Sequence, residues 1–229
     1  MKQNVVVLTG AGVSADSGIN TFRDADGLWE GHDVMEVASP QGFAANPELV
    51  LDFYNQRRRQ LFEVNPNDAH YALVALEEAY DVTVITQNVD DLHERAGSSN
   101  VLHLHGELLK VRSTRDSGQI LNWTEDLLLG DTCENGHQLR PHIVWFGEEV
   151  PLLTRAAQIT QRADIVIIIG TSMQVYPAAG LVNYAPLGIP IHFIDPRPSV
   201  RTSDFTNLNI IAERAAVGVP ILVKDLMRL

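Results

Sequence analysis

The sequence NVVVLTGAGVSA, residues 4–15, decides the fold class. Residues 4–9 form a short run of β-branched and apolar residues, which is typical of a strand buried in a parallel sheet. The turn Gly10–Gly12 and the following Ala15 satisfy the G-x-G-x-x-G/A pattern of dinucleotide-binding turns. A tight turn that requires positive φ would explain two glycines equally well. The context of strand, turn and helix favours the nucleotide-binding interpretation.

Similar apolar runs recur along the chain at 82–86, 165–169 and 189–194. Strands that alternate with helical segments predict an α/β fold with a mostly parallel sheet and helices on both faces. The stretch 110–140 is polar and weakly periodic, and we interpret it as a small module inserted into the sheet domain. Helices are predicted at 47–63, 67–80 and 90–96, and from about Pro220 to the end.

Composition excludes several classes of protein. The 229 residues carry 17 Lys and Arg against 29 Asp and Glu, a formal charge of −12. This charge argues against nucleic-acid binding, which depends on Lys and Arg at phosphates. The longest apolar stretch, 215–223, is broken by Gly218 and Pro220 and is too short for a membrane span. The single Cys133 and the absence of an export signal predict a cytoplasmic protein, and a monomer is expected.

Three further segments place polar or small residues after predicted strands. They read TQNVDDLH at 86–93, VWFGE at 144–148 and GTS at 170–172. Ligands bind at the carboxyl ends of strands in open α/β sheets, but Asn88 or Asp90 could also simply cap the next helix. The segment 144–148 predicts a strand that either accepts an extended peptide or forms an ordinary hairpin edge.

His103 and His105 lie in HLHGE, residues 103–107, and would point to the same face of a strand. A metal pair, a core histidine and a general base are three competing interpretations. A metal site needs further ligands that the sequence does not obviously supply, whereas imidazole has a pKa suited to a general base. The residues alone indicate that one of the two histidines is functional.

Six motifs in this order resemble those of sirtuins, which are NAD-dependent protein-lysine deacylases. The motifs are GAGVSADSGI, FRDADGLWE, TQNVDDLHERAG, HLHGEL, VWFGE and GTSMQVYPAAG. The resemblance covers nearly the whole chain and is greatest to bacterial members of the CobB type. It implies one sirtuin catalytic domain over 1–229, in which the acyl-lysine peptide and NAD meet in a cleft between a large Rossmann-like domain and a small one. The implied ranges are about 1–32, 81–108 and 143–229 for the large domain, and 33–80 (helical) and 109–142 (a degenerate zinc module) for the small domain.

The resemblance also implies the site residues. His105 would be the catalytic base and Asn88 a second catalytic residue. The consumed co-substrate NAD would be bound by Gly10, Ala11, Gly12, Ala15, Asp16, Phe22, Arg23, Trp29, Gln87, Asn88, Asp90, Gly170, Thr171, Ser172, Asp195 and Ala215. The acylated substrate would be bound by Tyr54, Arg57, Val144, Phe146, Gly147 and Glu148. Asp195 departs from the Asn usual in the family, although a carboxylate also accepts hydrogen bonds from ribose hydroxyls.

The implied reaction gives nicotinamide, 2′-O-acyl-ADP-ribose and free lysine. Tyr54 and Arg57 lie at i and i+3 of the predicted helix 47–63 and match the pair that binds the acyl carboxylate in sirtuins that remove acidic acyl groups. Both acetyl- and succinyl-lysine proteins are therefore expected substrates, unless 57–59 is only a solvated face of three arginines. Two alternatives remain for the chain: a sirtuin-like protein ADP-ribosyltransferase and a non-catalytic NAD-sensing module.

The metal site of the family is the main departure. Sirtuins usually carry two CxxC pairs, but 110–116 reads KVRSTRD, and of the second region only Cys133 remains, with His137 four residues on. A structural zinc site typically needs four Cys or His ligands, so we expect no structural zinc. An apolar cluster would then stabilise the module, with candidate members Leu121, Trp123, Leu127, Leu128, Leu129 and Leu139.

Overall fold

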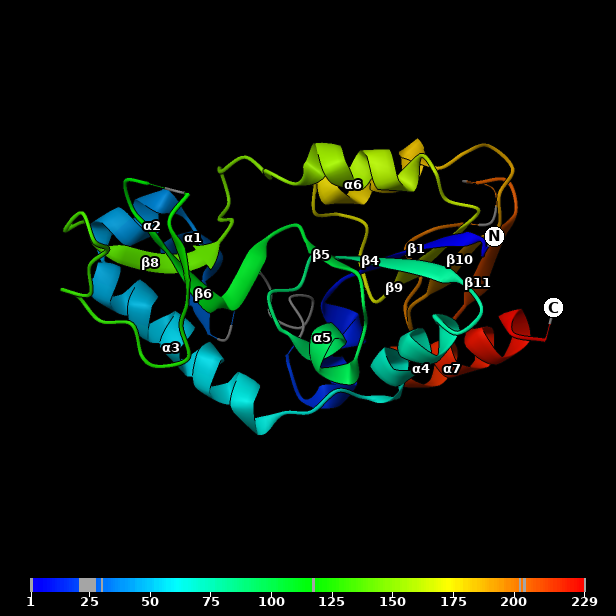
Figure 1. Ribbon diagram of the computed structural model, residues 1–229, viewed down its shortest axis with the longest axis horizontal. Helices are drawn as coiled ribbons and strands as arrows, with labels where there is room; N and C mark the ends of the chain where they lie inside the picture. Colours follow the sequence, from blue (N-terminus) through cyan, green and yellow to red (C-terminus); the bar gives the residue numbers. More distant parts are fainter. Residues whose placement is uncertain are drawn as a thin grey trace.

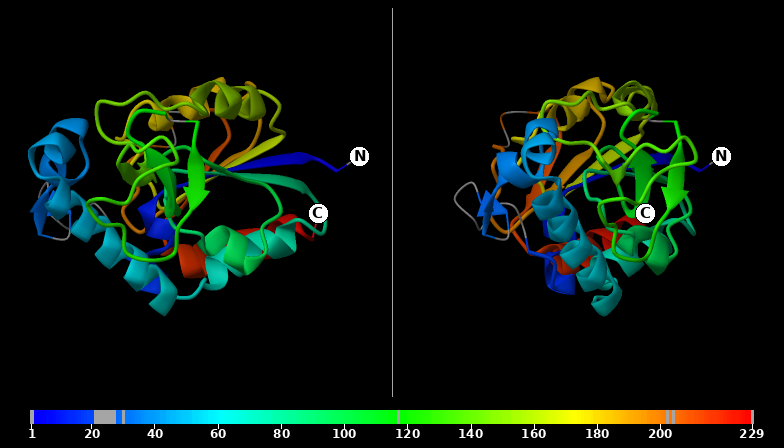
Figure 2. Two further views of the ribbon diagram at one scale, coloured as in Figure 1. Left: turned by 60° about the vertical axis from the view of Figure 1, so that its left-hand side comes forward. Right: turned by 90° about the vertical axis from the view of Figure 1, so that its left-hand side faces the viewer.

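The structure is a computed structural model with two parts of unequal size, a large sheet with its covering helices and a smaller part beside it (Figures 1 and 2). The described residues are 2–20, 28–29, 31–116, 118–201, 203 and 205–228, with only the backbone of Leu28 described. The predicted NAD-binding residues Phe22 and Arg23 lie outside these ranges.

Within the described residues, six strands form the main sheet in the order β11-β10-β9-β1-β4-β5, and every pairing is parallel. The central strand β1 ends level with its neighbours, since Thr9 lies opposite Thr86 of β4 and Ile169 of β9. The turns that follow these strands therefore open at one edge of the sheet. The strands are β1 (Asn4–Thr9), β4 (Asp81–Thr86), β5 (Val101–His103), β9 (Ile165–Ile169), β10 (Ile191–Ile194) and β11 (Leu208–Ile211).

Helices cover both faces of this sheet (Figure 1), which confirms the predicted fold class. One face carries α4 (Asp68–Leu76) and α7 (Ala215–Leu226), and the other carries α6 (Leu153–Thr160) and the 3₁₀ helix η4 (Ala178–Tyr184). None of the helices in the described ranges has the length and apolar character needed to cross a membrane.

Several predicted helix bounds were wrong. The helix predicted at 67–80 ends at Leu76, and the helix predicted at 90–96 begins at Leu92. The final helix begins at Ala215 and contains Pro220, because Ala215 and Val219 are buried against the sheet and this burial outweighs the hydrogen bond lost at the proline. After β1, the chain forms two short 3₁₀ helices, η1 (Ala11–Val13) and η2 (Ala15–Ser17), instead of an α-helix. By contrast, α5 (Leu92–Ala96) ends as predicted at Gly97, whose φ is 111°.

The smaller part is built around α3 (Pro47–Glu63), which has the predicted bounds and begins after an Asn46 side-chain cap. A three-stranded antiparallel sheet in the order β7-β6-β8 lies beside it in the described residues. The remaining elements are β2 (Leu28–Trp29), β3 (His32–Asp33), α1 (Val34–Val37), α2 (Pro40–Ala45), β6 (Gly106–Ser113), β7 (Ile120–Asn122) and β8 (Leu139–Ile143).

The predicted apolar cluster of the small module is only half correct. Leu127 and Leu139 are buried and Trp123 packs against them. Leu121, Leu128 and Leu129 are instead 45%, 59% and 47% exposed, because β7 is an edge strand and the 128–130 turn faces outward. The actual core cluster is Leu51, Val111, Leu127, Cys133 and Leu139, with Phe43 and Trp123 at its border.

Candidate active site

A cleft of about 470 Å³ opens at the carboxyl ends of β1, β4 and β9, between the main sheet and α3. Its size is typical of small-molecule sites. All predicted site residues in the described ranges line this cleft. They are Gly10, Ala11, Gly12, Ala15, Asp16, Trp29, Tyr54, Arg57, Gln87, Asn88, Asp90, His105, Val144, Phe146, Gly147, Glu148, Gly170, Thr171, Ser172, Asp195 and Ala215.

The turn after β1 packs directly against the turn after β9. The Gly12 N–H donates to the Gly170 carbonyl at 2.8 Å, and a Cβ on Gly12 would lie 2.6 Å from Gly170 Cα. A Cβ on Gly10 would lie 2.8 Å from the Gly170 carbonyl oxygen. Gly10 has a φ of −126°, so close packing of two strand ends, and not a positive φ, requires glycine here.

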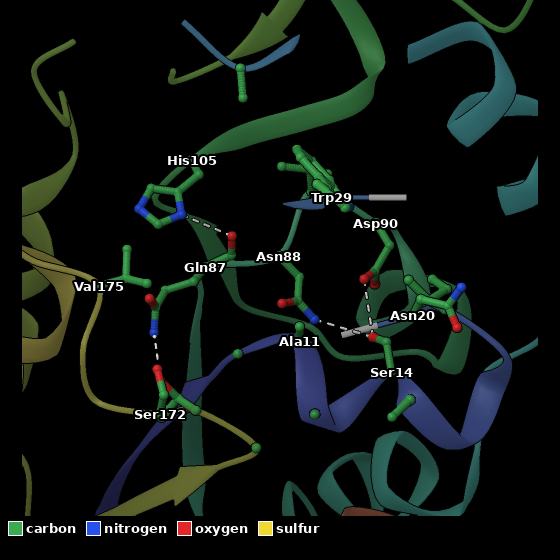
Figure 3. A pocket seen from close by; sticks show the side chains of 18 of the residues that line it. Ala11, Ser14, Asn20, Trp29, Gln87, Asn88, Asp90, His105, Ser172 and Val175 are labelled. Carbon is green, nitrogen blue, oxygen red and sulfur yellow. Dashed lines mark hydrogen bonds between the residues drawn. The ribbon is translucent and has the colours of Figure 1, made fainter. Parts of the chain in front are cut away.

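Asn88 and Asp90 are joined through the hydroxyl of Ser14 (Figure 3). Asn88 Nδ2 donates to Ser14 Oγ at 3.2 Å, and Ser14 Oγ donates to Asp90 Oδ2 at 3.0 Å. Asp90 Oδ1 accepts the Leu92 N–H at 3.2 Å, so Asp90 also caps α5. Burial raises the pKa of Asp90, against the effect of these hydrogen bonds. The network fixes three buried polar side chains at the cleft wall.

His105 is oriented by a backbone carbonyl. Its Nδ1 lies 3.0 Å from the Gln87 carbonyl oxygen (Figure 3), which can only accept. Nδ1 therefore carries the proton, and Nε2 keeps a lone pair. Burial lowers the pKa of His105, although the hydrogen bond to Gln87 opposes this shift. A neutral imidazole with a defined tautomer at a cleft is suited to accept a proton.

His103 has a different environment, so the prediction of a shared strand face was wrong. β5 ends at His103 and the chain bends before His105, which removes the two-residue alternation. His103 Nε2 lies 2.7 Å from Glu94 Oε1, and its Nδ1 lies 3.1 Å from the Asn88 carbonyl oxygen. Burial disfavours the charged ring, but the Glu94 carboxylate outweighs it and raises the pKa of His103. His103 thus supports the backbone of the Asn88 loop.

The three consecutive arginines of α3 are not one solvated face. Arg58 is buried and donates to Asn55 Oδ1 at 2.7 Å. Arg59 is exposed and pairs with Asp126 at 2.6 Å. Arg57 is half-buried and lines the cleft, with its guanidinium 4.5 Å from the centre of the Phe53 ring.

The segment 144–148 is a loop and not the predicted strand. Its backbone is nevertheless fixed, because the Val144 N–H donates to the His105 carbonyl and the Phe146 N–H to the Ala38 carbonyl, each at 2.9 Å. These two N–H groups are therefore already paired within the chain. Phe146 is 41% exposed at the cleft.

Glu148, predicted to contact substrate, holds this loop in place. Its carboxylate accepts from Arg140 at 2.7 Å, Arg112 at 3.0 Å and the Trp145 N–H at 2.8 Å. Burial alone would raise the pKa of Glu148, but these partners hold it below its ordinary value. The loop that carries Phe146 and Gly147 is thereby tied to β6 and β8.

Polar groups also gather at the far side of the cleft, after β9 and β10. Asp195 is 2% exposed and accepts the Arg197 N–H at 2.9 Å. Gln87 Nε2 donates to Thr171 Oγ1 at 3.3 Å, which links this side to the β4 turn. Asp16 forms an ion pair with Arg214 at the start of α7.

Nothing in the described ranges resembles a closed metal site. No group of three or more Cys, His, Asp or Glu side chains there has metal-binding geometry. Cys133 Sγ instead lies 3.4 Å from Ser113 Oγ, and the Cys133 N–H donates to the His137 carbonyl at 2.8 Å. The zinc-free state stays a prediction.

Sequence reasoning missed three residues that organise the cleft: Ser14, Trp145 and Arg140. Ser14 and Trp145 lie inside two of the sirtuin-like motifs, but no local pattern shows which side chain in a motif holds the other site residues in place. Arg140, which stacks 3.2 Å over the Trp145 ring, had no signal in the sequence.

Comparisons with known proteins agree with this geometry. Residues 10–177 match the sequence profile of the Sir2 family. An NAD-dependent protein deacylase of Helicobacter pylori is 64% identical over 195 residues, 85% of each chain. A Sir2 homologue solved as an NAD complex superposes with a TM-score of 0.88 at 40% identity, covering 99% of this chain and 90% of that one. A Sir2 protein bound to an acetylated peptide gives 0.79 at 28% identity, covering 99% and 93%. This chain belongs to the Sir2 family.

Proposed function

We propose that this chain removes acetyl and succinyl groups from protein lysines and consumes NAD, with nicotinamide, 2′-O-acyl-ADP-ribose and free lysine as products. The observation that carries the proposal is His105: a neutral, carbonyl-oriented imidazole lies in the same cleft as the strand-end turns and the Tyr54–Arg57 pair. The deacylase relative and the relatives solved with NAD and with acetylated peptide support it.

The volume of the cleft and the polar residues that line it support NAD as its ligand. Three nearly buried polar side chains, Asn88, Thr171 and Asp195, lie at its wall. Each is held by a hydrogen bond within the chain, which supports a fixed set of polar contacts for a bound nucleotide. The paired turns at Gly10–Gly12 and Gly170–Ser172 would hold the diphosphate and adenosine side, with Asp195 at a ribose. Gln87, Asn88 and Asp90 would hold the nicotinamide side. Bound NAD supplies the ribose carbon that the acyl oxygen attacks as nicotinamide leaves.

The residues of the chain have three tasks in this reaction. His105 Nε2 accepts the proton of the ribose hydroxyl, while the Gln87 carbonyl keeps Nδ1 protonated. Asn88, held by Ser14 and by the His103 contact to its carbonyl, positions the reacting ribose. The apolar walls around Trp29, Val144 and Phe146 exclude water that would otherwise hydrolyse NAD.

Tyr54 and Arg57 define the acyl end of the cleft. Both come from α3 and line the cavity. A guanidinium beside a phenol matches an acyl chain that ends in a carboxylate, because the Arg fork binds carboxylates in a bidentate manner. This arrangement supports succinyl-lysine as a substrate besides acetyl-lysine.

The protein substrate would lie along the loop Val144–Glu148, whose backbone is already fixed. The proposal keeps the large domain at about 1–32, 81–108 and 143–229 and the small domain at 33–80 and 109–142. One part of 33–80 differs, because α4 packs with α7 on the main sheet. A cytoplasmic location, a monomer and partners limited to acyl-lysine proteins belong to the same proposal.

Mass spectrometry of matched acetyl-, succinyl- and unmodified lysine peptides, each incubated with NAD, tests the proposal. We expect loss of the acyl group from both modified peptides only when NAD is present. ADP-ribose attached to a peptide would indicate an ADP-ribosyltransferase. NAD binding without any change in peptide mass would indicate a sensor, and either result contradicts the proposal.

A further inference from the structure

The Trp145 indole joins the acyl end of the cleft to a partly buried ion-pair cluster of Arg112, Arg140 and Glu148. Its Nε1 lies 3.0 Å from Tyr54 Oη, and the two side chains are 2% and 0% exposed. The Arg140 guanidinium covers the indole ring at 3.2 Å and pairs with Glu148 at 2.7 Å. Glu148 also accepts the Trp145 N–H. Trp145 is therefore held by three contacts: one at the face of its ring, one at its backbone N–H and one at its indole N–H.

The direction of the Trp145–Tyr54 hydrogen bond follows from chemistry alone. An indole N–H is a donor only, so the Tyr54 oxygen must accept. The phenol proton then has to be donated to another group, and Tyr54 makes no second hydrogen bond to the part of the chain that the structure describes. Burial raises the pKa of Tyr54 above its ordinary value, more than the Trp145 bond lowers it, so the phenol keeps this proton.

We propose that Trp145 is a positioning residue that makes Tyr54 an obligatory hydrogen-bond donor toward the acyl group, and that this selects acyl chains ending in a carboxylate. The inference rests on the proposed function, in which Tyr54 and Arg57 bind the acyl end. A succinyl carboxylate accepts the phenol proton, whereas an acetyl group has no acceptor at its far end. The orientation of Tyr54 therefore matters to one substrate and not to the other.

Arg140 and Glu148 explain why the indole holds its position. Without them, Trp145 could rotate away from Tyr54, since no other hydrogen bond to its ring nitrogen exists among the described residues. Arg140 faces Tyr54 and Arg112 as well, and Glu148 balances the two guanidinium charges. Because Arg140 belongs to β8, the cluster connects β8 through the Trp145 indole to Tyr54 at the acyl end of the cleft.

A double-mutant cycle tests the proposal on succinyl and acetyl peptides of one sequence. In Trp145→Phe, we expect the ratio of kcat/KM for succinyl over acetyl to fall about 5- to 20-fold, mainly through a higher KM for the succinyl peptide, as expected for a weakened bond to a charged group. The double variant Tyr54→Phe/Trp145→Phe should have the same ratio as the single variant Tyr54→Phe. Trp123→Phe, an equal change in the small module, should not move the ratio.

A second substitution keeps the test decisive if the smaller ring disturbs folding. Benzothienylalanine at position 145 keeps the ring size but has no N–H, and it should lower the ratio as Trp145→Phe does. An unchanged ratio in either variant, or an equal fall in the Tyr54→Phe background, would overturn the role of Trp145. A wild-type protein that leaves succinyl-lysine intact would instead overturn the proposed acyl specificity itself.

Discussion

The main sheet and the small module at 109–142 are held together in different ways. The sheet has long buried runs on both faces, and each strand pairs with neighbours over most of its length. The module relies on a five-residue core and on Asn55 of α3, which bonds both the N–H and the carbonyl of Leu127. Substitutions at the strand-end turns should therefore change activity, whereas substitutions at the module contacts should change stability.

The largest expected effect is a loss of activity on substitution of His105 in the cleft. His105→Ala should lower kcat/KM for deacylation by ~10²-fold or more, because a general base is lost, while NAD affinity and the urea midpoint stay near those of the wild type. His137→Ala, an exposed histidine of the module, is the matched control. Turnover close to normal in His105→Ala would remove this residue from the mechanism.

A substitution at the acyl end of the cleft should affect one substrate more than the other. Arg57→Met should reduce desuccinylation ~10- to 100-fold while deacetylation falls much less, since a charge-assisted hydrogen bond contributes about 1.5–3 kcal/mol. Steady-state kinetics on matched peptides measures the two losses. Equal losses on both peptides would show that Arg57 only supports the fold.

The expected effect of the module contacts on stability can be tested at Asn55. Asn55→Ala leaves the buried Leu127 N–H and one Arg58 hydrogen unpaired, so we expect the free energy of unfolding to fall by about 2–4 kcal/mol. Urea unfolding measures this change. Gln56→Ala removes an exposed bond to Asp52 from the same helix and should cost less than about 0.5 kcal/mol. Similar values for the two variants would contradict the proposed role of Asn55.

The pH profile tests the state of His105 directly. Burial lowers the pKa of His105, and only the neutral ring accepts a proton, so the base form persists to lower pH than for an ordinary histidine. The acid limb of kcat/KM should therefore lie below the usual histidine pKa of about 6.5. A limb at or above that value would show that a different group is the base.

The smallest expected effect concerns metal. Chelation with EDTA should change neither activity nor the melting temperature, because Cys133 contacts Ser113 and the module core is apolar. Elemental analysis of protein purified without added metal measures the content directly. One zinc per chain, with activity lost on chelation, would show that the module is a metal site after all.

Local sequence patterns predicted several of the regular strands and helices. Residues 4–9 and 165–169 match β1 and β9, and 47–63 matches α3, because buried β-branched runs and helical spacing depend on neighbours in the sequence. The final helix was misplaced because Pro220 is tolerated where tertiary burial compensates. Local signals thus identify elements better than their ends.

Contacts between distant residues were not predictable from those patterns. Trp145 and Tyr54 meet across 91 positions of sequence, and the exposure of Leu128 follows from an outward turn that no spacing rule indicates. The different hydrogen-bond partners of His103 and His105 depend on a bend of two residues after β5. Motif resemblance placed the site residues in one region, but it did not indicate which side chains hold the others.

In the proposed function, acyl removal and NAD consumption are one reaction in this cleft. The most direct measurement follows deacylated peptide, nicotinamide and acyl-ADP-ribose together, by liquid chromatography and mass spectrometry, at early times with a succinyl peptide. We expect the three products to form in equal amounts, and we expect the formation of all three to depend on His105. Deacylated peptide that forms without NAD, or with free succinate in place of succinyl-ADP-ribose from the earliest time, would contradict it.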